Sequence, residues 1–415
     1  QAVASGALAS GDTVVVNADG TVSAVAAVSQ SVGTAATFVN AHVTSRSVTF
    51  DSNSNRVVVV YKDQDNSGYG TCVVGTVDPS DNSISFGTPV VFRSAEMSYL
   101  NVAFDSNSNK VVVVYTAQVT NTPGTVIIGT VDSSDDSISF GSDVLFDNTV
   151  TYSETVFDSS NNKVVIFYAD GGNGGKLSAI VGTVSSNSIS FGSVASLDKV
   201  TTVFSATFDS NLNKAVVGYK DNANSSYGTA RVGTVSGTSI SFGTAVVFEA
   251  ASIDNIALAY DSFSQKVVIA YEDNGNSQYG TAIVGTVSGT GISFGTAVVF
   301  DDSAINRLER SATFDSNANK VILSYRQNAS PLYGKIAVLK VSGTSITFDT
   351  PFIPNDKRWD DNKITFDSNS NRVVAVYMDT ANSNYGTAIV YTSPSTNITA
   401  ENYIGIASNG YATGQ

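Results

Sequence analysis

The sequence has little of several residue types on which common functional sites depend. It holds one Cys, one His, one Trp and two Met in 415 residues. A single Cys excludes an internal disulfide and a Cys-based zinc site, and a single His excludes the imidazole clusters of transition-metal enzymes. We therefore expect neither a bound metal nor a cofactor.

Basic residues are scarce as well. The chain has 22 Lys and Arg against 36 Asp and Glu, a formal net charge of −14, and no Lys/Arg cluster of the kind that neutralises phosphates. No apolar run reaches the ~18 residues that a membrane span needs, and no charged-then-apolar signal segment opens the chain. We expect no nucleic-acid partner and no membrane insertion. Because the first residue is Gln, we also expect a processed chain or a piece of a longer one.

What the sequence does have is a repeat built on the stretch 50–61, Phe-Asp-Ser-Asn-Ser-Asn-Arg-Val-Val-Val-Val-Tyr. Such a period predicts a solenoid or a propeller. The aromatic-Asp pair that opens the stretch returns every 51 to 54 residues, as Phe50-Asp51, Phe104-Asp105, Phe157-Asp158, Phe208-Asp209, Tyr260-Asp261, Phe314-Asp315 and Phe366-Asp367.

Each repeat predicts four short strands, which in the first one are 46–51, 56–62, 70–77 and 83–92. Four strands per unit of about 50 residues are typical of a propeller blade, whereas helical repeats would show a 3.6-residue period. We predict an all-β fold, a seven-bladed β-propeller with four-stranded blades over residues 31–392.

The two ends of the chain complete this prediction. The seventh repeat has no fourth strand of the usual type, but residues 31–38 copy the fourth strand at 85–92, so the N-terminal strand should close the last blade and remove an exposed edge. Residues 1–30 predict a β-hairpin around Asp19-Gly20. We expect the segment 393–415 to pair with that hairpin in a small β module.

Three local features allow both a functional and a structural interpretation. The segment 51–55 resembles the start of an EF-hand calcium loop, but Arg56 stands where that loop needs Gly, and a hairpin turn is the stronger interpretation. The turn 65–70, Asp-Asn-Ser-Gly-Tyr-Gly, recurs with small changes, and its Asn and Tyr side chains could bind sugar or simply form the turn. Cys72 replaces Ala of other repeats and is predicted to be a small buried core residue.

Catalysis finds little support. No Gly-x-Ser-x-Gly elbow is present, His42 has no nucleophile partner, and no Gly-rich phosphate loop precedes a helix. A glycan-degrading propeller would need two carboxylates about 5–10 Å apart, and spacing along the chain cannot pair the acidic residues of the variable connections. These are Glu96, Glu154, Glu249, Asp254, Glu309, Asp360 and Asp361. We predict a binding or structural module without turnover.

The binding face should be the one that carries the connections between repeats, here called the top. Those connections vary in length and chemistry, whereas the loops between strands 1 and 2 and between strands 3 and 4, at the bottom, are nearly uniform. Aromatic and Arg side chains dominate binding hot spots, although each could equally pack on its own scaffold. The candidates are Arg46, Tyr99, Tyr152, Arg307, Arg310, Arg358 and Trp359.

The sequence also resembles a known group of proteins, and this resemblance implies a location and partners. The flanks 6–22 and 399–407, together with the recurring Val-Gly-Thr-Val-Ser-Gly-Thr-Ser-Ile-Ser-Phe-Gly-Thr, resemble tail-fibre and other virion structural proteins of marine tailed bacteriophages that contain an embedded propeller. This resemblance implies an extracellular virion adhesion module. Its partners would be a host surface glycan or protein receptor and other virion proteins, reached through the terminal modules, and a homo-oligomer is compatible with it. The alternative is a secreted or surface-attached carbohydrate-active enzyme or lectin.

Overall fold

The computed structural model describes residues 3–8, 13–17, 19–25, 27–117, 122–308, 310–396 and 403–406. The chain divides into two units, one of residues 1–31 and 392–415 and one of residues 32–391. The larger unit is all-β, with two large antiparallel sheets and two short 3₁₀ turns, η1 (Gly171–Asn173) and η2 (Asn274–Asn276). No helix in the described part has the length and apolar character that a membrane span requires.

The larger unit repeats one antiparallel pattern of strands. The first strands of repeats 1 to 7 are β5 (Ala36–Asp51), β9 (Val90–Asp105), β14 (Val150–Asp158), β18 (Ala195–Asp209), β22 (Val246–Asp261), β27 (Ala312–Asp315) and β31 (Trp359–Asp367). The second strands are β6 (Arg56–Asp63), β10 (Lys110–Ala117), β15 (Lys163–Asp170), β19 (Lys214–Asp221), β23 (Lys266–Asp273), β28 (Lys320–Gln327) and β32 (Arg372–Asp379).

Each second strand pairs with a third strand, and most third strands pair with a short outer one. The third strands are β7 (Tyr69–Asp78), β11 (Gly124–Asp132), β16 (Lys176–Ser185), β20 (Tyr227–Ser236), β24 (Tyr279–Ser288), β29 (Gly334–Ser342) and β33 (Tyr385–Thr392). The outer strands are β4 (Ser31–Val32), β8 (Ser83–Phe86), β12 (Ser137–Phe140), β13 (Val144–Asp147), β17 (Ser188–Phe191), β21 (Ser239–Phe242), β25 (Gly291–Phe294), β26 (Val298–Asn306) and β30 (Ser345–Phe348).

Most connections that we expected to be loops are strands. β9 runs without interruption from the outer edge of repeat 1, where Val90 pairs with Cys72, to the first strand of repeat 2, where Phe104 pairs with Val111. The change of partner falls between Glu96, which pairs with Tyr69, and Met97, which pairs with Ala117, and the register shifts on both sides of it. Tyr99 lies at the bulge on the β10 side, with a left-handed φ of 52°. The pattern differs from the expectation because the top connection finds hydrogen-bond partners on both neighbouring repeats, and a bulge lets one strand serve both.

The core lies between neighbouring repeats and is built from the second strands. Their apolar residues, such as Val57 to Val60 in β6, are fully buried on both faces. Each second strand also carries one Tyr, and all seven of these are buried, namely Tyr61, Tyr115, Tyr168, Tyr219, Tyr271, Tyr325 and Tyr377. Cys72 is fully buried, which confirms its prediction as a core residue.

A glycine at the top of the third strands makes room for an aromatic ring of the outer edge. A Cβ at Gly70 would lie 2.7 Å from the ring of Phe92, which in turn contacts Tyr115 of the next repeat. The same arrangement joins Gly280 to Phe300. Shape complementarity of this kind fixes how one repeat sits on the next, because packed interiors leave no space for an extra methyl group.

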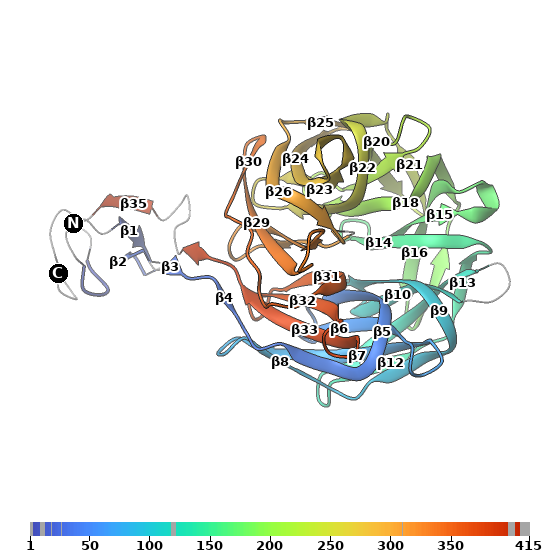
Figure 1. Ribbon diagram of the computed structural model, residues 1–415, viewed down its shortest axis with the longest axis horizontal. Helices are drawn as coiled ribbons and strands as arrows, with labels where there is room; N and C mark the ends of the chain where they lie inside the picture. Colours follow the sequence, from blue (N-terminus) through green and yellow to red (C-terminus); the bar gives the residue numbers. More distant parts are fainter. Residues whose placement is uncertain are drawn as a thin grey trace. The chain divides into compact units, whose positions relative to one another are not determined.

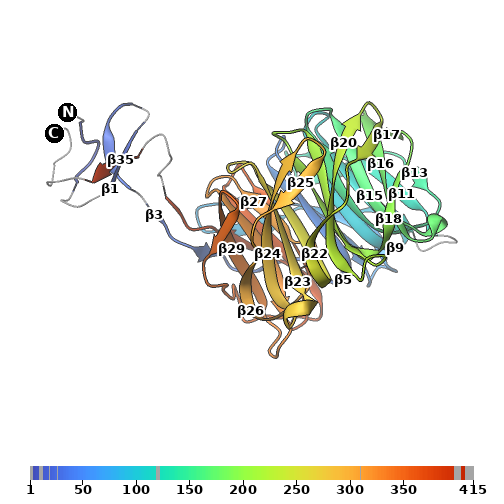
Figure 2. The ribbon, with the colours of Figure 1, turned by 90° about the horizontal axis from the view of Figure 1, so that it is seen from above.

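The first strands contact one another in the order β5, β9, β14, β18, β22, β27 and β31, and β31 contacts β5. In Figure 1 the colours run around the unit, so that red β31 to β33 lie beside blue β5 to β7. Figure 2 shows strands such as β22, β23 and β24 running between the two faces of the unit.

Repeat 7 contacts repeat 1 as repeat 1 contacts repeat 2. Arg56 donates to the Ser133 carbonyl at 2.9 Å on the next repeat, and Arg372 donates to the Pro79 carbonyl at 2.8 Å. The first half of β5 pairs with β33, Thr387 opposite Thr37, and Phe38 covers Gly386 as Phe92 covers Gly70.

The bottom hairpins are closed by the Asp of the aromatic-Asp pair. Asp51 is 3% exposed, and its Oδ1 accepts hydrogen bonds from the backbone N–H groups of Asn53 at 2.9 Å and Ser54 at 3.0 Å. The same two bonds form at the other six repeats. The EF-hand-like pattern is therefore a turn motif, and the described residues contain no group of three acidic, His or Cys side chains fit for a metal.

The smaller unit contains strands from both ends of the chain. β1 (Thr13–Val16) pairs with β2 (Val22–Ala24) and with β35 (Tyr403–Ile406), both antiparallel. A two-residue pair joins β3 (Ala27–Val28) to β34 (Ser395–Thr396). Val14 and Val22, together with Ala4 and Leu8, form a small apolar cluster.

Candidate functional site

The top of the larger unit carries ion pairs that follow the repeat. Lys62 follows Tyr61 on the second strand of repeat 1, and its Nζ lies 2.7 Å from the Glu96 carboxylate, 34 residues later. In repeat 4, Lys220 binds Asp254 at 2.9 Å with the same 34-residue separation. Each of these pairs joins a second strand to the connection that follows it, one cation to one acid.

Repeat 6 has a cation at the same position but a different arrangement around its acid. Arg326 follows Tyr325 on β28, and its Nη1 donates to Asp360, again 34 residues later. Two further arginines reach the same carboxylate: Arg358 Nε donates to Oδ2 at 2.8 Å, and Arg307 Nε lies 3.9 Å from Oδ1. One carboxylate is thus shared by three guanidinium groups, called here the Asp360 cluster.

Arg46 and Asp361 lie next to the Asp360 cluster. Arg46 is 1% exposed and donates to the backbone carbonyls of Asp360 at 2.8 Å, Asp361 at 2.7 Å and Val43 at 2.9 Å. Desolvation lowers the pKa of Arg46, whereas the negative charge of the Asp361 carboxylate acts to raise it. Arg46 therefore ties the connection before repeat 1 to the one before repeat 7, and it presents no surface to a partner.

A second group of side chains surrounds Glu154 on β14. Its Oε2 lies 3.2 Å from Arg310 Nε and accepts a hydrogen bond from Asn101 at 3.2 Å. Burial raises the pKa of Glu154 to about 7, although Arg310, Lys363 and Asn101 all act to lower it. Desolvation dominates because Glu154 is only 9% exposed, so the carboxyl group loses its proton near neutral pH rather than in acid.

Aromatic rings cover the guanidinium of Arg310. Its central carbon lies 5.0 Å from the ring centre of Phe204 and 5.5 Å from that of Tyr152, which are cation–π distances. Tyr152 in turn packs against Tyr99, with 4.2 Å between ring centres. Tyr99, Tyr152 and Arg310 all have left-handed φ angles, between 52° and 53°, a strained conformation for bulky residues.

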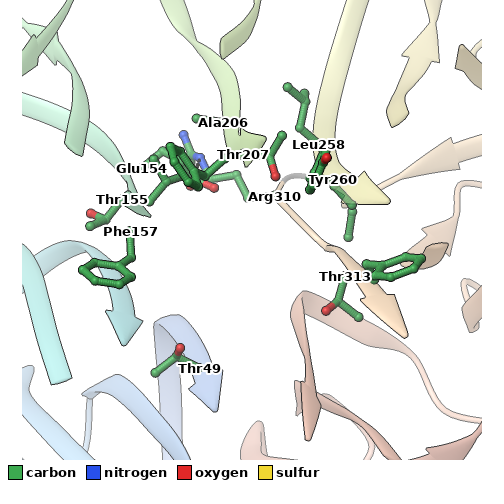
Figure 3. Close-up of a pocket in the computed structure, with 15 residues that line it drawn as sticks. Thr49, Glu154, Thr155, Phe157, Ala206, Thr207, Leu258, Tyr260, Arg310 and Thr313 are labelled. Carbon is green, nitrogen blue, oxygen red and sulfur yellow. Dashed lines mark ion pairs between the residues drawn. The ribbon is translucent and has the colours of Figure 1, made fainter. Parts of the chain in front are cut away.

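Below Glu154 lies a central cavity of ≈ 440 Å³ lined by the first strands (Figure 3). Threonines supply much of the polar part of its wall, and Glu154 and Arg310 also contribute. The labelled threonines in this view are Thr49, Thr155, Thr207 and Thr313. A wall of hydroxyl groups with a carboxyl and a guanidinium group offers hydrogen bonds to a polar ligand or to water.

The structure separates the seven predicted site residues into three kinds. Arg307 and Arg358 have side chains 43% exposed, and Arg310, Tyr99 and Tyr152 are partly buried. Arg46 and Trp359 are buried and do not lie on the surface as binding anchors.

Trp359 takes the place of an outer-edge Phe. Its ring stacks on Tyr377 at 4.5 Å and 13°, its Nε1 donates to Asn355 at 2.9 Å, and a Cβ at Gly334 would lie 2.1 Å from it. The packing interpretation therefore holds for this residue.

Sequence reasoning missed Arg326 and did not recognise Asp360 as the centre of a site. The usable signal was the 34-residue separation between a cation after the second-strand Tyr and an acid in the next connection. The turn tyrosines, such as Tyr69 and Tyr385, are partly buried, and Glu309 lies outside the described residues.

Comparisons with known proteins give a likeness of fold only. No family model matches the sequence, and no curated protein matches it. The crystal structure of a triple arginine-to-alanine variant of AofleA from Arthrobotrys oligospora is similar, with 11% identity, a TM-score of 0.50, and coverage of 81% of this chain and 94% of that one.

Two further structures score lower. A protein of unknown function from Dyadobacter fermentans has 10% identity, a TM-score of 0.48, and coverage of 89% of this chain and 99% of that one. A Trypanosoma rangeli sialidase has 12% identity, a TM-score of 0.45, and coverage of 73% and 56%. At such scores neither likeness bears on function.

Proposed function

We propose that the larger unit is a seven-bladed β-propeller, closed by pairing of the N-terminal strand with the last repeat, and that its top face binds carbohydrate without turnover. The propeller is supported by the order of contacts among the first strands and by the equivalent contacts of Arg56 and Arg372. A closed ring leaves no open strand edge, which explains why the first half of β5 pairs so far from its own repeat.

The observation that carries the binding function is the composition of the top. On a uniform scaffold with a net charge of −14, exposed arginines and half-buried tyrosines gather at one end, around Asp360 and Glu154. Guanidinium groups and aromatic faces are the side chains that bind sugars through hydrogen bonds and stacking. Ligand sites also favour connections held by a rigid framework.

A glycoside hydrolase is the competing function. It needs an acid with a raised pKa and a second carboxylate nearby. Glu154 has the raised pKa, but the groups that act on it are Arg310, Lys363 and Asn101. A carboxyl held by a guanidinium is suited to positioning rather than to donating a proton, and we therefore favour binding.

The test is a glycan array probed with the intact chain, with the double variant Tyr99→Ala, Arg358→Ala and with the bottom variant Asn53→Ala, Asn107→Ala. We expect wild type and the bottom variant to bind the same glycans and the top variant to lose them. Loss with the bottom variant alone would contradict the assignment of the face. Release of reducing ends from a bound polysaccharide would contradict the absence of turnover. The virion setting implied by the sequence resemblance remains a separate prediction.

A further inference from the structure

The three second-strand cations of repeats 1, 4 and 6 give an internal comparison. In repeats 1 and 4 this position carries one cation and one acid, Lys62 with Glu96 and Lys220 with Asp254. In the other four repeats no cation stands there. Repeat 6 keeps that pair, Arg326 with Asp360, and adds Arg307 and Arg358 from two other segments. The scaffold does not require the added arginines, since two repeats are built without them.

We propose that Arg307, Arg326 and Arg358 form a site for the acidic group, a carboxylate or a sulfate ester, of an anionic polysaccharide. This inference rests on the proposed carbohydrate-binding function and names its ligand class. Asp360 holds the three guanidinium groups together, and the ligand's acidic group supplies negative charge that Asp360 and its neighbour Asp361 leave unmet.

The cluster carries uncompensated positive charge. Three guanidinium groups share the carboxylate of Asp360, which is 5% exposed. The neighbouring carboxylate of Asp361 also acts on Arg307, but it is shared with Arg46 and Lys363. Arg326 is 7% exposed, and its buried Nε has no hydrogen-bond partner among the described residues. Burial, and next the charges of Arg358 and Arg307, lower the pKa of Arg326 to about 10. Like charges crowded at a partly desolvated place are costly, and such costs concentrate where a ligand offsets them.

The geometry fits an anion that approaches from solvent. Arg307 and Arg358 are each 43% exposed and come from different segments, one after β26 and one before β31. Arg307 lies at Oδ1 of Asp360 and Arg358 at Oδ2. Arg307 also has a left-handed φ of 58°, which is strained for a side chain of this size. The planar fork of Arg matches the oxygens of a carboxylate or a sulfate through paired charge-assisted hydrogen bonds.

The experiment measures binding of three soluble polymers to the intact chain by isothermal titration calorimetry: polygalacturonate for carboxylate, dextran sulfate for sulfate, and neutral dextran. The variants are Arg307→Ala and Arg358→Ala. The matched control is Arg93→Ala, which removes an equally exposed arginine (42%), ion-paired with Asp143, elsewhere on the same unit. Thermal unfolding of each variant reports on folding.

We expect one acidic polymer to bind, dextran to bind more weakly or not at all, and each cluster variant to lose about tenfold or more in affinity, the worth of one charge-assisted hydrogen bond. Arg93→Ala should stay within about twofold. If Arg93→Ala lost as much affinity as the cluster variants, the binding would depend on net charge alone, and the proposed site would be wrong. Binding only of neutral glycans would overturn this site and leave the proposed function standing, and a chain that binds no glycan would overturn both.

Discussion

At the scale of single residues, two buried carboxyl groups at the top differ in the number of cations that lie beside them. Asp360 lies among three arginines, whereas Glu154 has one arginine, one amide and a more distant lysine. Desolvation therefore prevails at Glu154 and raises its pKa, to about 7. A raised carboxyl pKa means that the folded protein holds the proton more tightly than the unfolded chain does.

Glu154→Gln should consequently remove part of the pH dependence of folding. The ordinary Glu pKa of 4.5 describes the unfolded chain and about 7 the folded one, so the wild type should lose stability as pH rises from about 4.5 to about 7. The loss is of the order of 1–3 kcal/mol. Urea unfolding at pH 5 and pH 8 should show a smaller difference between the two pH values for Glu154→Gln than for wild type. Glu96→Gln, at a carboxylate 54% exposed, is the control and should keep the wild-type difference. Identical pH dependence in wild type and Glu154→Gln would refute the assignment.

At the scale of elements, neighbouring repeats are matched through glycine and an aromatic ring. The ring is Phe92 at Gly70 and Phe300 at Gly280, but at Gly334 it is Trp359, and at Gly386 it is Phe38 from the far end of the chain. The space that this glycine leaves for a ring, called here the slot, is therefore a property of the third strand. The ring that fills it can come from a different place in the sequence. This explains why Trp359, in a connection that is irregular by sequence, is fully buried.

Gly334→Ala tests this slot. The added Cβ would lie 2.1 Å from the Trp359 ring, and overpacking of this kind typically costs 1–3 kcal/mol. Since Trp359 is the only Trp, its fluorescence reports on the slot directly, and we expect a red-shifted emission together with a lower Tm. Gly291→Ala is the control, because its nearest neighbour would be 3.6 Å away, an ordinary contact. A Gly334→Ala protein with unchanged emission and Tm would mean that the ring does not fill this slot.

At the scale of the whole molecule, the first and last repeats are held together by two contacts that other repeats also make, those of Arg372 and Phe38, and by one of their own, that of Arg46. Arg372 reaches the bottom loop of repeat 1, Arg46 binds the carbonyls before repeat 7, and Phe38 covers Gly386. If these contacts close a ring, its stability is cooperative, since opening one junction exposes the edge of β33 and an empty slot.

Deletion of residues 1–40 should therefore cause aggregation or broaden the unfolding transition. Deletion of residues 1–28 is the control, since it leaves the segment that pairs with β33 intact. Size-exclusion chromatography and calorimetry separate the outcomes. A monomeric, cooperatively unfolding protein after removal of residues 1–40 would show that the ring does not depend on this strand.

The sequence alone determined much of the local structure. A period of 51–54 residues predicted all-β repeats, because each repeat carries its own strand patterns and turn residues. The buried Cys72 and the Asp51 turn were predictable for the same reason, since a turn or a core strand depends on residues close in the chain. Because residues 31–38 resemble the fourth strand of the repeat, the sequence also predicted that they pair with residues 385–392. In the structure β5 pairs with β33.

Only the tertiary structure decided which side chains meet at the top. The 34-residue separation could have paired Arg326 with Asp360, but nothing in the spacing of Arg307 and Arg358 indicates that they reach the same carboxylate. Nor could sequence decide between surface and core for Arg46 and Trp359, because each packs against another repeat, Arg46 on the Asp360 carbonyl and Trp359 on Gly334. The repeat is a local property repeated along the chain, whereas the cluster exists only where distant segments are packed together, and packing depends on the whole molecule.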